Sequence, residues 1–267
     1  MYLKFIERNL RIYLKDKVGI FFSFLGMFIS LIIYIFFLRT NLIDSLPTIA
    51  HADKFTDTWM VAGLISIVAL TTPLNAFGQK MEDRKNHKLN DFKVNNDLKA
   101  NSLNWLYTLT AIIEGAVSTI VFTILCFGYL SIRYNENAFN KEFVLTLLFN
   151  LLLITFSANF FALVTKYLRT MSSFSALSTI LGTLAGFLSG TYIVYDALPN
   201  FMRNIVNFWP GYQIAAITRS EMMHEFTTTT PQNVLVALGV SSNIEKAILV
   251  VIGATIVSMV LNQLSRE

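Results

Sequence analysis

The residue with the most unusual setting for chemistry is Glu114, which lies inside the apolar stretch 103–130. An ionisable side chain at membrane depth is costly, and such residues commonly face a substrate path or an ion pathway. The same carboxyl group could instead be a protonated or hydrogen-bonded structural group between two helices. Glu114 is therefore a candidate pathway residue, with both interpretations open.

Patterns typical of catalysis or nucleotide binding are missing from the sequence. It contains no GxxxxGK[ST] motif and no GxGxxG motif after a strand. His51, His87 and His224 lie far apart in different loops, which disfavours a joint metal site. We therefore expect no catalytic residue, no cofactor and no metal in this chain, and we expect that it is not an enzyme.

Glycine and proline interrupt the apolar segment 187–219 at three points. Gly190 ends an apolar stretch, and Pro199 and Pro210 each open a shorter one. Because proline suits the first turn of a helix and not its interior, we expect two re-entrant half-helices here. Irregular backbone at membrane depth survives only when it is buried in protein or lines a wet cavity. The segment therefore predicts a membrane protein with a path through it.

The composition is that of an integral membrane protein. Of the 267 residues, 54% are hydrophobic and only 14% are charged, and the apolar residues fall in long blocks. A spanning helix needs about 20 apolar residues. Five stretches reach this length and a sixth is shorter: 18–38, 59–78, 103–130, 143–165, 174–194 and 247–264. We expect an all-α fold with six transmembrane helices in a single domain over residues 1–267.

The basic residues predict the orientation in the membrane. Fourteen of the 21 Lys and Arg residues fall on the side that carries both ends of the chain, against seven on the other side. Cytoplasmic loops carry the excess of Lys and Arg. We therefore expect a multi-pass protein of the cell membrane with both termini in the cytoplasm. The net charge of +4 arises at the ends of apolar segments and does not indicate binding to nucleic acid.

Residues 1–17 are patterned like a helix that lies in the membrane surface. Leu3, Ile6 and Leu10 recur at helical spacing, while Lys4 and Arg8 share another face. Such an amphipathic helix directs its cations toward anionic lipid headgroups. A merely solvated basic end is the alternative.

The segment 79–102 mixes six Lys and Arg residues with four Asp and Glu residues. Its few apolar residues, Phe92 among them, are too sparse for a core. We expect a cytoplasmic loop with short helical content. Exposed apolar residues indicate a docking surface for another protein. A solvated loop without a partner explains the composition equally well.

Gly182, Gly186 and Gly190 are spaced four residues apart in the predicted fifth span. Such a stripe of small residues lets two helix backbones approach closely. The contact could join two copies in a dimer or pack helices within one chain.

This arrangement resembles the membrane (permease) subunit of a type-2 ABC exporter over nearly the whole chain. The shared features are six spans, a surface helix before the first, a charged loop after the second and a broken segment before the last. The most specific part of the resemblance consists of Gly190, Leu198, Pro199, Pro210, Tyr212 and Arg219.

The resemblance implies a transport function with partners. The broken segment would help close the translocation path, which makes Pro199, Pro210 and Tyr212 pathway or gate residues. Two permease subunits, identical or related, would meet around a central route. A separate ABC ATPase subunit would carry ATP and Mg. The loop residues Glu82, Asp83, Arg84 and Phe92 would couple the chain to that subunit.

Other functions remain to be weighed against the exporter. An ATP-independent secondary transporter or channel could use Glu114 as a proton or cation site. Secondary carriers usually have two related halves with matching broken helices, whereas this sequence has one broken segment, which favours the exporter. A membrane-embedded enzyme lacks a catalytic constellation. The substrate could be a drug, a peptide, a lipid or a glycan.

Overall fold

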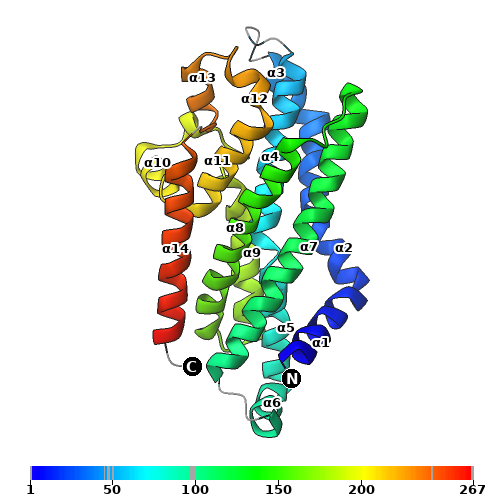
Figure 1. The fold of residues 1–267 in the computed structure, drawn as a ribbon, viewed down its shortest axis with the longest axis vertical. Helices are drawn as coiled ribbons and strands as arrows, with labels where there is room; N and C mark the ends of the chain where they lie inside the picture. The colour runs from blue at the N-terminus through cyan, green and yellow to red at the C-terminus, as the bar shows by residue number, and fades with distance from the viewer. Residues whose placement is uncertain are drawn as a thin grey trace.

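The computed structural model of the chain is an all-helical bundle. No strand occurs among the residues that it describes, which are 2–44, 46, 49, 51–96, 100–241 and 243–265. The long helices run side by side along the longest axis (Figure 1). Both chain ends lie at one end of the bundle together with α6, and we call this the termini end. The opposite end carries α3, α12 and α13, and we call it the far end. The predicted all-α class is confirmed.

Five helical stretches are long and apolar enough to cross a membrane. They coincide, in order, with the predicted spans from the second to the sixth. They are α4 with α5 (Ala52–Thr71 and Leu74–Lys85), α7 (Ala100–Tyr134), α8 (Lys141–Lys166), α9 (Met171–Leu188) and α14 (Ile244–Leu264).

The predicted first span, 18–38, lies in one continuous helical run. It comprises α2 (Lys17–Ile33), the π-helical turn η1 (Tyr34–Leu38) and α3 (Arg39–Asp44). The π-helical turn begins at Tyr34, whose buried hydroxyl donates a hydrogen bond to Asp57 at 2.7 Å. Local π-helical turns are rare and often mark functional positions. That this run also crosses the membrane, as the predicted first span, stays a prediction.

The second span is longer than predicted at both ends. The chain is helical from Ala52 to Lys85, interrupted only by a turn at Thr72 and Pro73. Proline has no N–H to donate, so the helix breaks there and resumes as α5. Residues 79–85, predicted as loop, therefore belong to α5. Hydropathy alone assigns these charged residues to a loop, because the helix continues beyond its apolar part.

The rest of the predicted loop is a short helix and a connection. After α5, His87 adopts a left-handed φ of 60°, and α6 (Lys88–Asn96) follows. Residues 97–99 of the predicted loop lie outside the described residues. The expectation of short helical content holds.

The fifth span ends earlier than predicted. Helix α9 stops at Leu188, and Gly190 adopts a left-handed φ of 64°. Thr191 and Tyr192 donate their backbone N–H groups to the Gly186 carbonyl at 3.0 and 3.2 Å. A left-handed glycine that satisfies the last carbonyls is a common helix stop. Residues 189–194 are therefore a turn and not part of the helix.

The predicted broken segment forms two short helices. Pro199 precedes α10 (Asn200–Val206), and Pro210 is the first residue of α11 (Pro210–Met222). Both prolines thus stand at helix starts, as predicted. Most of α11 is buried, and it packs against α4, α8 and α14. Whether the pair re-enters the membrane stays a prediction.

The remaining short helices cap the ends of the bundle. Helix α1 (Tyr2–Lys15) lies oblique to the long helices at the termini end (Figure 1). It buries Phe5 and Asn9, while most of its basic residues are exposed. The 3-10 turn η2 (Tyr195–Ala197) precedes α10, and α12 (His224–Thr227) and α13 (Gln232–Ala237) follow α11.

Helix α4 is the centre of the molecule. Every residue from 55 to 70 is buried, and the helix contacts α7, α8, α9 and α11. Movement of α5 at the termini end would reach this central helix directly, because only the turn at Pro73 separates the two.

Candidate functional site

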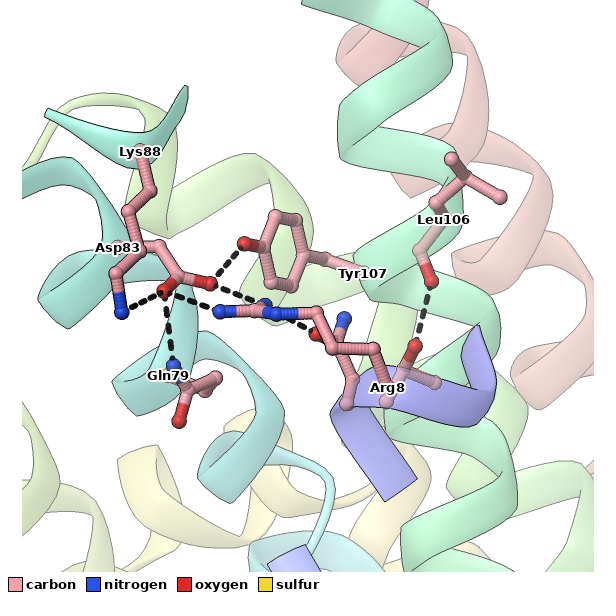
Figure 2. A network of polar contacts seen from close by, with 8 residues as sticks. Arg8, Gln79, Asp83, Lys88, Leu106 and Tyr107 are labelled. Carbon is pink, nitrogen blue, oxygen red and sulfur yellow. Dashed lines mark hydrogen bonds and ion pairs between the residues drawn. The ribbon is translucent and has the colours of Figure 1, made fainter. Parts of the chain in front are cut away.

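The termini end is organised around Asp83, whose side chain is completely buried. Arg8 from α1 donates to both carboxylate oxygens, at 2.8 and 2.9 Å, in a two-pronged pairing. Tyr107 from α7 donates its hydroxyl at 2.6 Å, and Gln79 donates from one turn earlier in α5 at 3.0 Å. Figure 2 shows these groups converging on Asp83, with Lys88 from α6 at 3.8 Å. One carboxylate thus joins four helices.

Aromatic rings cover this ion pair. The Arg8 guanidinium lies over the ring of Phe92 from α6, 5.1 Å from its centroid. Phe5 packs edge-on against both Phe92 and Tyr107, with ring centroids 5.2 Å apart in each case. The hydrogen bond with Asp83 raises the pKa of Arg8 above its ordinary value, so Arg8 stays cationic. Helix α6 is therefore held on α1 through Phe92.

The predicted coupling residues point in different directions. Successive residues of a helix are about 100° apart, and here Asp83 faces inward while Glu82 is exposed. Arg84 is half-buried and donates to the Leu168 carbonyl, in the connection between α8 and α9, at 2.6 Å. Of the predicted set, Glu82 presents the most exposed side chain at this end.

A second polar network lies beside the first. Lys80 of α5 donates to the Asn104 side chain of α7 at 2.7 Å, and Asn104 donates to the Asn262 side chain of α14 at 2.9 Å. Lys166 of α8 donates to the Asn262 and Ser265 carbonyls. The two networks together tie α5 to α1, α6, α7, α8 and α14.

The structure places Glu114 in a cleft of about 240 Å³ between α1, α2, α5, α7 and α9. The residue is only 3% exposed. Its Oε2 atom has no hydrogen-bond partner among the described residues. Among the described residues, no side chain of a neighbouring helix pairs with this oxygen, and the role of Glu114 stays a prediction.

Three of the residues that carry the resemblance, Gly190, Tyr212 and Arg219, meet in space. Arg219 of α11 is fully buried and donates to the Gly190 carbonyl at 2.9 Å and the Ser189 carbonyl at 3.3 Å. These carbonyls lie at the C-terminal end of α9, where the helix dipole favours a cation. The guanidinium also lies over the Trp59 ring, 4.6 Å from its centroid. The carbonyls and the ring explain how a buried arginine is tolerated.

Tyr212 packs beside this arginine site. Its ring lies 5.5 Å from that of Tyr195, and it borders both left-handed glycines, Gly190 and Gly239. A side chain at Gly190 would approach the Tyr212 ring to 3.1 Å. Pro210 sets the start of the helix that carries Tyr212. The predicted gate residue Tyr212 is therefore packed against the turn that ends α9, whereas Pro210 begins α11 and Pro199 precedes α10.

The predicted glycine stripe divides between two surroundings. Gly186 is covered by the ring of Tyr192, and Gly190 faces Tyr212 and Arg219. Nothing lies within 4 Å of the Cβ position at Gly182. Packing within the chain accounts for the first two glycines. Contact with a second copy stays a prediction for Gly182.

A buried acid at the far end was not predicted from the sequence. The side chain of Asp57 accepts hydrogen bonds from Tyr34 at 2.7 Å, from Arg39 at 2.8 Å and from Tyr134. These contacts clasp the first helical run to α4 and α7. Asp57 lies just before the predicted span 59–78, where a charged residue is expected to belong to a loop. No local spacing connects it with Tyr134.

The partners of Asp83 were not predicted either, for the same reason: no local spacing connects them with Asp83. Arg8 is separated from Asp83 by 75 residues, and its place on a basic face of 1–17 predicted only lipid contact. Tyr107, near the start of a predicted span, is an ordinary residue in that position. Within the part of the chain that the structure describes, no group of three or more His, Cys, Asp or Glu residues could hold a metal ion.

Comparison with known proteins assigns the chain to a family. Residues 3–223 match the family model described as ABC-2 type transporter. No individually curated protein matches the chain significantly. The matched region runs from α1 to the end of α11 and includes the Asp83 network, the Glu114 cleft and the broken segment. Because the match covers well over half of the chain, the protein belongs to the ABC-2 type transporter family.

Proposed function

We propose that this chain is the permease subunit of an ATP-driven exporter in the cell membrane, driven by a separate ATP-hydrolysing subunit. Membership of the ABC-2 transporter family supports a transport role. The sequence has no P-loop of its own, so ATP and Mg would be bound by the partner. In this proposal, residues 1–267 form one permease domain with six spans, of which the run α2–η1–α3 is the first.

The observation that carries the proposal is the Asp83 network. A push on α6 or on the exposed Glu82 would be shared at once by α1, α5 and α7, because all four helices meet at one buried carboxylate. From α5 the movement passes through the turn at Pro73 to the central helix α4. We propose that the termini end faces the cytoplasm, where the excess of Lys and Arg belongs, and that the ATPase subunit docks there.

The first test is charge reversal at the docking end. Glu82→Lys, made in the full chain and co-expressed with the proposed P-loop ATPase subunit, should uncouple ATP turnover from export while both subunits still co-purify. Glu245→Lys is the matched control, since Glu245 is also exposed but lies in the first turn of α14 at the far end. Normal export by the Glu82 variant at normal expression would reject a coupling role.

A second candidate function is supported by Glu114. An ATP-independent transporter or channel could use a buried carboxylate with a free oxygen as a proton or cation site. One measurement distinguishes an ATP-driven exporter from an ATP-independent transporter. The exporter loses transport when the ATPase subunit carries a disabled P-loop lysine, whereas a secondary transporter keeps working in an ion gradient.

A further inference from the structure

The cleft around Glu114 has a charge pattern opposite to that of its surroundings. Three of its lining residues carry carboxylates, namely Asp16, Glu82 and Glu114, and none of the described lining residues is Lys, Arg or His. The neighbouring helices are nevertheless rich in basic residues. Arg8 is turned toward Asp83, and Arg84 donates to a carbonyl on another side. The cleft is therefore suited to a cation.

Two buried polar atoms at the cleft have no protein partner among the described residues. Oε2 of Glu114 and Nδ2 of Asn9 both lack a hydrogen bond, and the two residues are 3% and 2% exposed. A buried carboxylate without a counter-charge costs several kcal/mol, by an order-of-magnitude estimate. A bound cation would remove that cost. The nearby hydroxyl of Tyr13 is already engaged with Ser118 at 2.7 Å.

The rest of the lining is apolar on the side of α2 and α9. Ile20, Met171 and Phe174 border the cleft there. Its volume of about 240 Å³ is below the roughly 300–1,000 Å³ of sites that enclose a whole drug-sized molecule. The cleft thus has room for a headgroup and the beginning of an alkyl chain, with the remainder of the chain extending along the helices.

We propose that this cleft binds the ammonium headgroup of an amphiphile, with Glu114 as its counter-charge. Asp16 and Glu82 add negative charge at the rim. The inference rests on the proposed transport function for the role of that amphiphile as cargo. The binding itself concerns this chain alone.

Binding can be measured by equilibrium dialysis of dodecyltrimethylammonium against the full-length chain in an uncharged maltoside detergent. Glu114→Gln should weaken binding at least about tenfold, because it removes the charge that contacts the headgroup. Glu142→Gln is the matched control, since Glu142 also has an unpartnered buried carboxylate oxygen but does not line this cleft. It should bind as the unmodified chain does.

Two further measurements keep the test decisive. The thermal unfolding midpoint of Glu114→Gln without amphiphile should equal or exceed that of the unmodified chain, because glutamine avoids the cost of holding a carboxyl group at this buried position. Asp16→Asn keeps a side-chain oxygen for the Gly19 N–H but loses the charge, and should also weaken binding. The proposal is overturned if both variants bind like the unmodified chain, or if dodecanol displaces the cation equally well.

A membrane lipid and a foreign amphiphile can both carry an ammonium headgroup. Competition by lysophosphatidylethanolamine would support ammonium recognition with a membrane lipid as its source. Binding of the cation without such competition would support it with a purely cationic amphiphile. Because no ATPase subunit is present, failure of binding here leaves the proposed coupling untouched. Glu82 also lines the cleft, so the coupling experiment is repeated with Arg84→Glu, whose side chain does not line it, and failure of coupling there leaves the binding measurement untouched.

Discussion

At the scale of single residues, the buried acids Asp57 and Asp83 each anchor one end of the bundle. Asp83 accepts from Arg8 and the Tyr107 hydroxyl, and Asp57 accepts from Arg39 and two tyrosine hydroxyls. Removing one partner of a buried charge costs more than the pair contributes, because the remaining group is left without compensation. These acids therefore fix which helices move together, whatever they contribute to net stability.

Tyr107→Phe should lower the free energy of unfolding in detergent by about 2 kcal/mol. It removes a 2.6 Å hydrogen bond to the Asp83 carboxylate and leaves the ring packing against Phe5 intact. Tyr129→Phe on the same helix is the control. The hydroxyl of Tyr129 is 3.4 Å from Asp57, too long for a strong bond, so the loss there should stay below about 0.5 kcal/mol. Equal losses for both variants would contradict the assignment.

At the scale of elements, helix α4 approaches the turn after α9 so closely that one position tolerates only glycine. A Cβ at Gly63 would lie 2.8 Å from Cγ2 of Thr191 and 2.9 Å from Nη2 of Arg219. Both neighbours are held by their own hydrogen bonds, so neither can yield without loss. The site couples the central helix to the start of the broken segment.

Gly63→Ala should therefore destabilise the protein by about 1–3 kcal/mol, through overpacking. Gly253→Ala, in α14, should have the opposite sign. Nothing lies within 4 Å of its Cβ position, and alanine in a helix is favoured over glycine by roughly 0.5–1 kcal/mol. Unfolding of the two variants followed by tryptophan fluorescence checks the difference. Stabilisation by both substitutions would show that the approach at Gly63 is looser than the structure indicates.

Sequence reasoning located the long helices because each is apolar for about 20 residues, and a membrane demands that length. It misplaced helix ends where polar residues continue a helix, as at 79–85, or where a left-handed glycine stops one, as at Gly190. The prolines at 199 and 210 were read correctly because their effect is local. The Arg8–Asp83 pair could not be found, since its partners are brought together only by packing of α1 on α5 and α7.

At the scale of the whole molecule, the two ends differ in their polar contacts. The termini end combines two polar networks with exposed charge at Glu82, whereas the far end is clasped by Asp57 and by Lys54, which pairs with Glu136 and Glu225 at 2.7 Å each. The central helix α4 connects them. In the proposed mechanism, a force applied at the termini end would pass along this buried helix to the turns around Arg219.

The exposed face of α9 leads to the last prediction, a dimer of permease chains. Little of this helix is buried in the bundle, and Gly182 presents an open backbone flanked by exposed Ile180 and Leu184. In a Cys126→Ala background, Gly182→Cys should form a disulfide-linked dimer in membranes under mild oxidation, because such a bond needs Cα atoms within about 7 Å. Gly128→Cys on α7, where the Cβ position is equally open, should remain monomeric on a non-reducing gel. Equal cross-linking at both positions would indicate random collision, and none at Gly182 would place the contact between copies on another face.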